Sequence, residues 1–299
     1  MLKILRLLLI VNLAFAYSEL IHAEGLKTAG IASAHPLATK AGYEILEQGG
    51  NAFDAAVTVS AVLSVVEPYS SGLGGGGFFL LHSIEKDESI FIDAREKAPS
   101  MANRDMYLDK NGDVLRTASL NGPLASGIPG LPAALHHVSN KHGSMPLYKL
   151  LQPAIRLARE GFPAYERLIT ALTVAERSRT LSPKFKAVFM PNGKLPNVGE
   201  IIKQPELAKT LEIIASSGQE GFYNSFFTET MVQEARQDGS IWLEEDFENY
   251  SVVEREPITI NFLGAQLTTA PPPSSGGTTI ATILNIISEF DFSGMETSA

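Results

Sequence analysis

The stretch that decides the fold is Gly72–Leu81, with the sequence GLGGGGFFLL. Bulky apolar residues directly after a run of glycines are typical of a central strand, predicted here over Phe78–Leu81. Working outward, Ser89–Arg95 predicts a partner strand, and the polar Glu85–Glu88 predicts the turn of a hairpin between them. On the N-terminal side, Ala55–Val66 is apolar nearly all round and predicts a buried helix. A buried helix followed by a hairpin indicates a mixed, layered core.

The glycine run also matches the pattern G-x-G-x-x-G over Gly72–Gly77. In dinucleotide-binding folds this pattern follows a strand and opens a helix. Here a helix precedes it and a strand follows, so the order disfavours dinucleotide binding. Two interpretations stay open. The glycines allow close packing of backbone where a side chain would clash, or they leave room beside the sheet for a ligand.

Capping and breaking residues bound the helices before this stretch. Pro36 suits the first turn of a helix that Gly49 and Gly50 end, since glycine adopts a left-handed cap at no steric cost. Asn51 then predicts the N-cap of the next helix, with Asp54 at its third position. For both polar residues we prefer capping to a catalytic role.

The rest of the chain mixes helices and strands. A helix is predicted over Leu147–Arg159, kinked near Pro153 because proline removes a backbone donor. Two further strands are predicted over Thr259–Phe262 and Gln266–Thr269, and a final amphipathic helix over Thr278–Phe290. This mixture predicts a layered α/β or α+β core.

Composition excludes several classes of protein. The 299 residues are 44% hydrophobic and 19% charged, which excludes a wholly disordered or collagen-like chain. The net charge of -9 disfavours binding to the phosphates of nucleic acids. The chain has no cysteine, so disulfides, cysteine nucleophiles, iron–sulfur clusters and thiolate zinc sites are excluded.

The N-terminal residues predict an export signal. Lys3 and Arg6 precede a short apolar run, Leu7–Phe15, and Ala16 and Ala23 are candidate cleavage positions. This order is typical of a cleaved signal peptide over residues 1–23, leaving residues 24–299 as the domain and a periplasmic or extracellular location. The alternative is a buried N-terminal helix. The run is too short to span a bilayer, and no later stretch is long and apolar enough.

Arg95 is the candidate binding residue. It ends a strand in which Phe91, Asp93 and Arg95 point to one side, and it lies close to the glycine-rich strand. A guanidinium at this place can grip a carboxylate through two parallel charge-assisted hydrogen bonds. The alternative is a structural ion pair with Asp93, Glu96 or a distant acid, and the residues alone favour that alternative.

Two other sets of residues have both a functional and a structural interpretation. Pro271–Gly277 (PPPSSGG) precedes a helix, so its serines either help to bind an anion or form a stiff turn with an N-cap. His136, His137 and His142 lie near a helix end, but they are five or six residues apart rather than four. That spacing disfavours a metal site and favours a solvated helix end.

Familiar catalytic motifs are absent, and the residues alone point to no specific reaction. There is no G-x-S-x-G elbow, Walker A loop, H-E-x-x-H or EF-hand loop. Several long and unusual segments, however, match one family in order from about Gly30 to the C-terminus. They are Gly49–Val57, Ser71–Phe78, Asp93–Pro99, Ser126–Gly130, Gln152–Phe162, Gly221–Tyr223 and Pro271–Gly277. Through these segments the chain resembles the large subunit of γ-glutamyltranspeptidases.

The resemblance implies an α+β fold, the αββα sandwich of N-terminal nucleophile hydrolases. In that family a precursor cleaves itself, and the new N-terminal threonine of the small subunit attacks the γ-glutamyl amide with its own amine as base. Water or an amino-acid or peptide acceptor then takes the glutamyl group from the acyl-enzyme. Arg95 matches the family arginine that binds the α-carboxylate of substrates such as glutathione. We expect no cofactor and no metal.

One departure limits what the resemblance implies. The family nucleophile lies well beyond the Pro271–Gly277 segment in a Thr-Thr-His-like context, whereas Thr278 and Thr279 precede Ile280 here and are not assigned that role. We therefore expect a large-subunit portion, truncated before the catalytic threonine and inactive alone. Such a portion should leave sheet edges and apolar surface exposed. The alternatives are a cephalosporin or glutaryl acylase, and a non-catalytic scaffold or pseudoenzyme.

Overall fold

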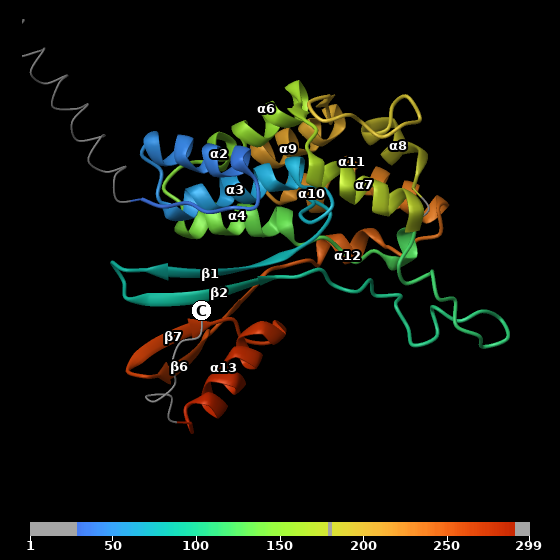
Figure 1. The fold of residues 1–299 in the computed structure, drawn as a ribbon. Helices are drawn as coiled ribbons and strands as arrows, with labels where there is room; N and C mark the ends of the chain where they lie inside the picture. Colours follow the sequence, from blue (N-terminus) through green and yellow to red (C-terminus); the bar gives the residue numbers. More distant parts are fainter. Residues whose placement is uncertain (1–28, 179–180, 291–299) are drawn as a thin grey trace, which may run out of the picture.

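The computed structural model describes residues 29–178 and 181–290, and its elements lie in layers (Figure 1). A layer of helices covers one side of a sheet that contains β1 and β2. A second hairpin, β6 and β7, lies on the other side of that sheet with α13 beyond it (Figure 1). The order is thus helix, sheet, sheet, helix. The predicted signal peptide, residues 1–23, lies outside the described residues.

The central sheet is antiparallel, in the order β1-β2-β5. The predicted hairpin is confirmed, with Phe78 opposite Asp93 across its two strands. The third strand, β5, adds at the free edge of β2 and pairs Phe91 with Arg255. The three strands of this sheet are β1 (Gly77–Ser83), β2 (Glu88–Ala94) and β5 (Val253–Arg255).

Apolar side chains join the sheet to the helices. Leu81 of β1 and Ile92 of β2 belong to the same buried cluster as the helix residues Val57, Val62 and Val65. The central helix is buried on most sides, as its sequence predicted. The helices of this layer are α2 (Pro36–Glu47), α3 (Ala52–Val66), α4 (Leu131–His142), α5 (Leu147–Leu150) and α6 (Gln152–Glu160).

The kinked helix predicted over Leu147–Arg159 is two helices. The first, α5, stops at Leu150 and the second, α6, begins at Gln152. Pro153 sits in the first turn of α6, where its missing N–H costs nothing. The proline therefore starts a new helix rather than kinking one.

The cap at the start of α3 is a structural joint, as preferred from the sequence. The side chain of Asn51 accepts hydrogen bonds from the N–H groups of Phe53 and Asp54, and Asp54 accepts from the N–H of Asn51 at 2.8 Å. The fully buried carboxylate of Asp54 also accepts from the hydroxyl of Ser144 at 2.6 Å and from the backbone N–H groups of Ser144 and Met145. These bonds tie α3 to the loop after α4.

Smaller elements surround this core. A short ladder pairs Phe162 with Ile202, and a 3-10 turn covers Pro123–Ala125. The strands of that ladder are β3 (Phe162–Pro163) and β4 (Ile201–Ile202). The outer helices are α7 (Glu166–Ser178), α8 (Pro183–Phe189), α9 (Pro205–Ser217), α10 (Glu220–Tyr223), α11 (Phe226–Gln237) and α12 (Glu244–Glu248).

The second hairpin confirms both C-terminal strands as β6 (Ile258–Phe262) and β7 (Ala265–Thr269). The last helix, α13 (Ser275–Ile287), begins earlier than predicted and includes two glycines. A Cβ on Gly277 would collide with the carbonyl of Ala270, so this glycine serves close packing and does not break the helix.

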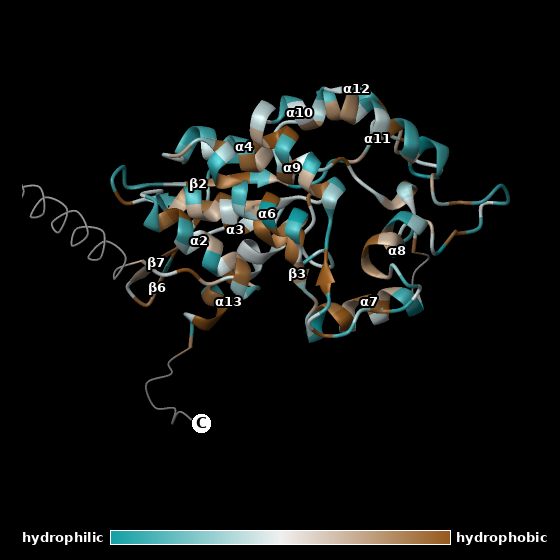
Figure 2. Cartoon of the chain, turned by 90° about the horizontal axis from the view of Figure 1, so that it is seen from above, coloured by the Kyte–Doolittle hydropathy of each residue, from teal (hydrophilic) through white to brown (hydrophobic). Residues whose placement is uncertain are grey.

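Apolar side chains remain exposed on this last helix, which is partly brown in Figure 2. Ile280, Ile283 and Ile286 are all at least 44% exposed. On the first sheet, β1 is an edge strand among the described residues, and Leu80 is exposed. No helix in the described ranges is both long and apolar enough to cross a membrane.

Candidate functional site

Arg95 lies directly after β2, exposed to solvent. Its predicted alternative partner, Asp93, is occupied by another arginine: both Nε and an NH2 group of Arg255 donate to Asp93, at 3.0 and 2.8 Å. Within the described residues, the guanidinium of Arg95 makes no ion pair or hydrogen bond. The structural pairing with Asp93 is therefore wrong, and the guanidinium is free to bind a ligand.

The backbone on both sides of this guanidinium is held firmly. The N–H of Arg95 donates to Asp93 Oδ1 at 3.1 Å, and its carbonyl accepts from the hydroxyl of Tyr250 at 2.9 Å. Two residues later, Lys97 exchanges hydrogen bonds with Ile128 in both directions, at 3.2 and 2.8 Å. We call residues 95–98 the Arg95 segment. Its side chains are exposed while its backbone is anchored, an arrangement that presents charge to a ligand.

Glycines allow two loops to pack against this segment. A Cβ on Gly76 would lie 2.9 Å from the backbone nitrogen of Glu96, and one on Gly127 would lie 3.0 Å from the carbonyl of Lys97. The carbonyl of Gly75 accepts from the N–H groups of Gly130 and Leu131, where α4 begins. The close-packing interpretation of the glycine run is therefore correct at Gly76. The run leads into strand β1 rather than a helix, so it lacks the dinucleotide-binding arrangement.

Aromatic residues from distant parts of the chain support the same place. The rings of Tyr250 and Tyr223 stack with centroids 5.3 Å apart, and Tyr223 donates to the carbonyl of Pro129 at 2.8 Å. Burial raises the pKa of both tyrosines, so each hydroxyl stays protonated and able to donate at neutral pH. Trp242 donates from its indole nitrogen to the carbonyl of Ser126 at 3.0 Å.

Sequence reasoning missed these supports. Tyr223 lies in a segment quoted only for its family resemblance, and Tyr250 lies in no predicted element. Neither has a local pattern that points to its hydrogen-bond partner, which is 94 positions away for Tyr223 and 155 for Tyr250. From sequence alone, a tyrosine whose hydroxyl donates a structural hydrogen bond cannot be distinguished from one that only fills the core.

A cavity of about 770 Å³ lies beside the glycine run. Small residues of α3, the stretch Gly75–Phe79 and the side chain of Glu96 form its wall. The cavity shows that the run also leaves room next to the sheet, the second interpretation left open. Glu96 lines this cavity, whereas Arg95 does not.

Before α13, the segment Pro271–Gly277 forms the predicted turn, in which the N–H of Ser274 donates to the carbonyl of Pro271 at 3.1 Å. The hydroxyl of Ser274 makes no capping hydrogen bond, so the N-cap interpretation is not observed. The hydroxyls of Thr278 and Thr279 both donate to the carbonyl of Ser275, at 3.0 and 2.8 Å. Both threonine hydroxyls are thus bonded within their own helix.

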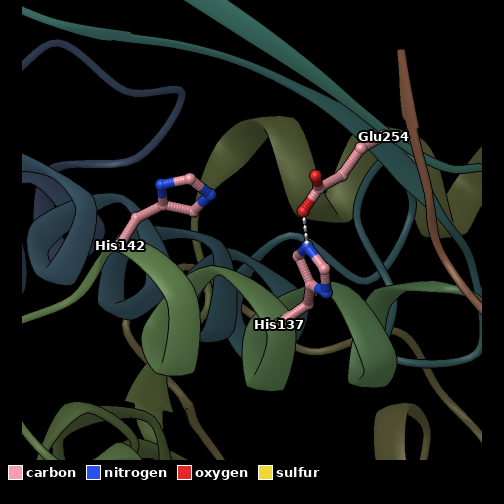
Figure 3. Close-up of side chains that lie close together, drawn as sticks. All are labelled: His137, His142 and Glu254. Carbon is pink, nitrogen blue, oxygen red and sulfur yellow. Dashed lines mark hydrogen bonds and ion pairs between the residues drawn. The ribbon is translucent and has the colours of Figure 1, made fainter. Parts of the chain in front are cut away.

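Two histidines of α4 form a cluster with a carboxylate of a second element, strand β5 (Figure 3). The Nε2–H of His137 donates to Oε1 of Glu254 on β5 at 2.6 Å, and one ligand atom each of His137, His142 and Glu254 lies within 4.8 Å of the others. His136 instead lies against Gly218. Spacing along one helix could not reveal this cluster, because its carboxylate comes from a strand more than 100 residues away.

Comparisons with known proteins agree with the arrangement of elements. The γ-glutamyltranspeptidase family model matches residues 38–299. The chain is similar to the glutathione hydrolase proenzymes of Escherichia coli strain K12 and Bacillus subtilis strain 168. The identities are 41% over 274 residues (91% of this chain, 47% of the relative) and 37% over 281 residues (93% and 47%). The chain therefore spans about half the length of the curated relatives it matches.

Solved structures give the same result for the fold. The crystal structure of Helicobacter pylori γ-glutamyltranspeptidase superimposes with a TM-score of 0.86 at 37% identity, covering 90% of this chain and 77% of that chain. The likeness confirms the predicted α+β fold of the N-terminal nucleophile hydrolase type.

Proposed function

The chain belongs to the γ-glutamyltranspeptidase family, and from this premise we propose that it forms the large-subunit part of a γ-glutamyltransferase and glutathione hydrolase. In this proposal Arg95 binds the α-carboxylate of the γ-glutamyl donor. The observation that carries the assignment is the free, exposed guanidinium of Arg95 beside an Asp93 that Arg255 already occupies.

The geometry suits a carboxylate. Guanidinium presents a planar fork of donors that matches the two oxygens of a carboxylate. The N–H of Arg95 donates to Asp93 and its carbonyl accepts from Tyr250, so the backbone on both sides of the Arg95 Cα is fixed. Holding the acid end of the donor in this way orients its γ-amide for attack.

The attacking group comes from a partner subunit in this proposal. An N-terminal threonine of the small subunit adds its hydroxyl oxygen to the γ-carbonyl, and its own amine takes the hydroxyl proton. The amide C–N bond breaks as the leaving amine receives a proton, giving an acyl-enzyme. Water then releases glutamate, or the amine of an amino acid or peptide takes the γ-glutamyl group. The 299-residue chain alone then shows no turnover, and glutathione hydrolysis by it would contradict this.

Kinetics of the complete, self-processed protein test the role of Arg95. We expect Arg95→Lys and Arg95→Gln to raise KM for a γ-glutamyl anilide about 10- to 100-fold, because a charge-assisted hydrogen bond contributes about 1.5–3 kcal/mol. Arg104→Lys is the matched control, since Arg104 is exposed and pairs only with Asp105 next to it.

A second substrate sharpens the test. The 4-aminobutyryl anilide lacks only the α-carboxylate, so the wild-type protein should discriminate against it and the Arg95 variants should not. An unchanged KM in the Arg95 variants, or equal discrimination in all variants, would show that Arg95 does not bind the carboxylate. The cephalosporin or glutaryl acylase alternative needs a third substrate, the glutaryl anilide, which keeps the terminal carboxylate and lacks only the α-amine. A preference for it over the γ-glutamyl anilide would favour that alternative.

The alternative of a non-catalytic scaffold has its own test. A non-catalytic relative would not cleave itself, so two bands from the purified precursor on a denaturing gel favour the enzyme.

Residues 1–23 direct export in this proposal, which rests on the order of charged, apolar and small residues. N-terminal sequencing of exported protein should find cleavage after Ala16 or Ala23.

A further inference from the structure

We propose that His137, His142 and Glu254 form a binding site for one divalent transition-metal ion, with Zn²⁺ as the best match. His137 comes from the middle of α4, His142 from its last position and the carboxylate from β5 (Figure 3). One ligand atom from each lies within 4.8 Å of the others, so small side-chain rotations bring all three onto a single ion. The site lies apart from Arg95, and its failure would leave the proposed function untouched.

The donor set fits zinc. Imidazole nitrogen and carboxylate oxygen are ordinary zinc ligands, bound at about 2.0–2.2 Å. Three protein ligands leave the fourth position of a tetrahedral ion for water. A cavity of about 180 Å³ borders His142 and Lys141, and neither His137 nor Glu254 lines it.

The backbones that carry the ligands are held in place. The carbonyl of His142 accepts from Nδ2 of Asn51 at 2.8 Å, which fixes the end of α4 against the start of α3. Glu254 pairs with Ile92 in the sheet. The ligands therefore stand on anchored elements and not on a loose loop, as a specific metal site requires.

Two of the three ligand atoms already share a proton, because Nε2 of His137 donates to Oε1 of Glu254 at 2.6 Å. When the ion binds Nε2 of His137 and Oε1 of Glu254, it replaces the proton between them, and that proton leaves to solvent.

One atom of the cluster lacks a partner. Nε2 of His142 is buried and makes no hydrogen bond among the described residues. Buried polar atoms are nearly always satisfied, and an ion or its bound water would satisfy this one. The ring also packs against Phe53 with centroids 5.6 Å apart, which limits how far it can turn away.

A lysine competes with the ion. Lys141 Nζ lies 3.7 Å from the same Oε1 of Glu254, but its side chain is 60% exposed and can swing into solvent. Lys86 adds positive charge near His142. Removing the ammonium of Lys141 should therefore strengthen metal binding, whereas a purely structural His137–Glu254 hydrogen bond predicts no such gain.

Calorimetric titration of the complete protein with ZnCl2, after removal of bound metal with a chelator, tests the site. We expect one equivalent to bind, and affinity to fall at least about 100-fold in His137→Gln, His142→Gln and Glu254→Gln, because loss of a ligand costs more than the roughly 10- to 100-fold loss of an outer partner. His82→Gln and Glu248→Gln are matched controls on the exposed surface and should leave affinity unchanged.

Two further measurements do not depend on a damaged variant. Lys141→Met should bind zinc several-fold more tightly than the wild type. Co²⁺ added to the wild-type protein should give the intense visible bands of a four-coordinate ion. The proposal is overturned if the wild type binds no saturable equivalent of zinc, or if the three ligand variants bind as tightly as the controls.

Discussion

Replacing Asp93 with asparagine tests whether this carboxylate holds the Arg95 segment. The side chain of Asp93 is only 9% exposed, and it accepts two hydrogen bonds from Arg255 and one from the N–H of Arg95. Asp93→Asn keeps the shape and one acceptor oxygen but removes the charge. It also turns an NH2 group toward one of these donors.

The expected cost is about 2 kcal/mol of unfolding free energy. Hydrogen bonds to a charged group contribute about 1.5–3 kcal/mol, against about 0.5–1.5 kcal/mol for neutral ones. Arg255 is 38% exposed, and solvent screening reduces its share of the loss. The substitution should therefore cost less than the roughly 3–5 kcal/mol of breaking a fully buried pair.

Urea unfolding of the full chain, followed by far-ultraviolet circular dichroism, measures this cost. The matched control is Asp105→Asn, because the pair of Asp105 with Arg104 is exposed on both sides and should change stability by less than about 0.5 kcal/mol. If Asp93→Asn and Asp105→Asn lower the free energy of unfolding equally, Asp93 does not anchor the Arg95 segment. The claim that Arg95 is presented from a fixed backbone is then refuted.

Three other changes test separate parts of the fold. Asp54→Ala removes the acceptor at the start of α3 and should lower the free energy of unfolding by about 3 kcal/mol; a loss below about 1 kcal/mol would contradict the joint. Gly76→Ala forces a methyl group against the carbonyl of Ala94 and should cost about 1–3 kcal/mol in the same assay, so a neutral result would exclude close packing there. Burial lowers the pKa of His35 below its ordinary value of 6.5, so the unfolded chain binds a proton first, and the free energy of unfolding should fall as the pH drops below 6.5. His35→Asn keeps an N-cap acceptor for the N–H of Leu37 and should reduce that slope in urea midpoints measured on both sides of pH 6.5, whereas an unchanged slope would assign it to other groups.

Local patterns carried most of the fold that the sequence could predict. A pattern of about ten residues was enough to predict three features: the buried helix α3, the hairpin of β1 and β2, and the capping pair Asn51 and Asp54. The pair of strands β6 and β7 does the same. These elements depend on periodicity, glycine and capping, which are readable along the chain.

Long-range pairing could not be predicted. Strand β5 spans only Val253–Arg255, too short for an alternating pattern to show, and its partner lies about 160 residues earlier. Because β5 was missing from the prediction, its Arg255 was not seen to occupy Asp93 and its Glu254 was not seen to meet His137. The pair of Arg255 with Asp93 and the cluster of His137 with Glu254 were both missed because β5 was not predicted.

Trp242 gives the molecule a built-in optical reporter. It is the one tryptophan in the sequence, and its indole is tethered to the carbonyl of Ser126, at the beginning of the loop whose Ile128 is bonded to Lys97. The ring also packs edge-on against Phe247, with centroids 5.2 Å apart, so its emission reports the exposure of this part of the core. A red shift that precedes the loss of helical signal would show that this part opens before the helices melt.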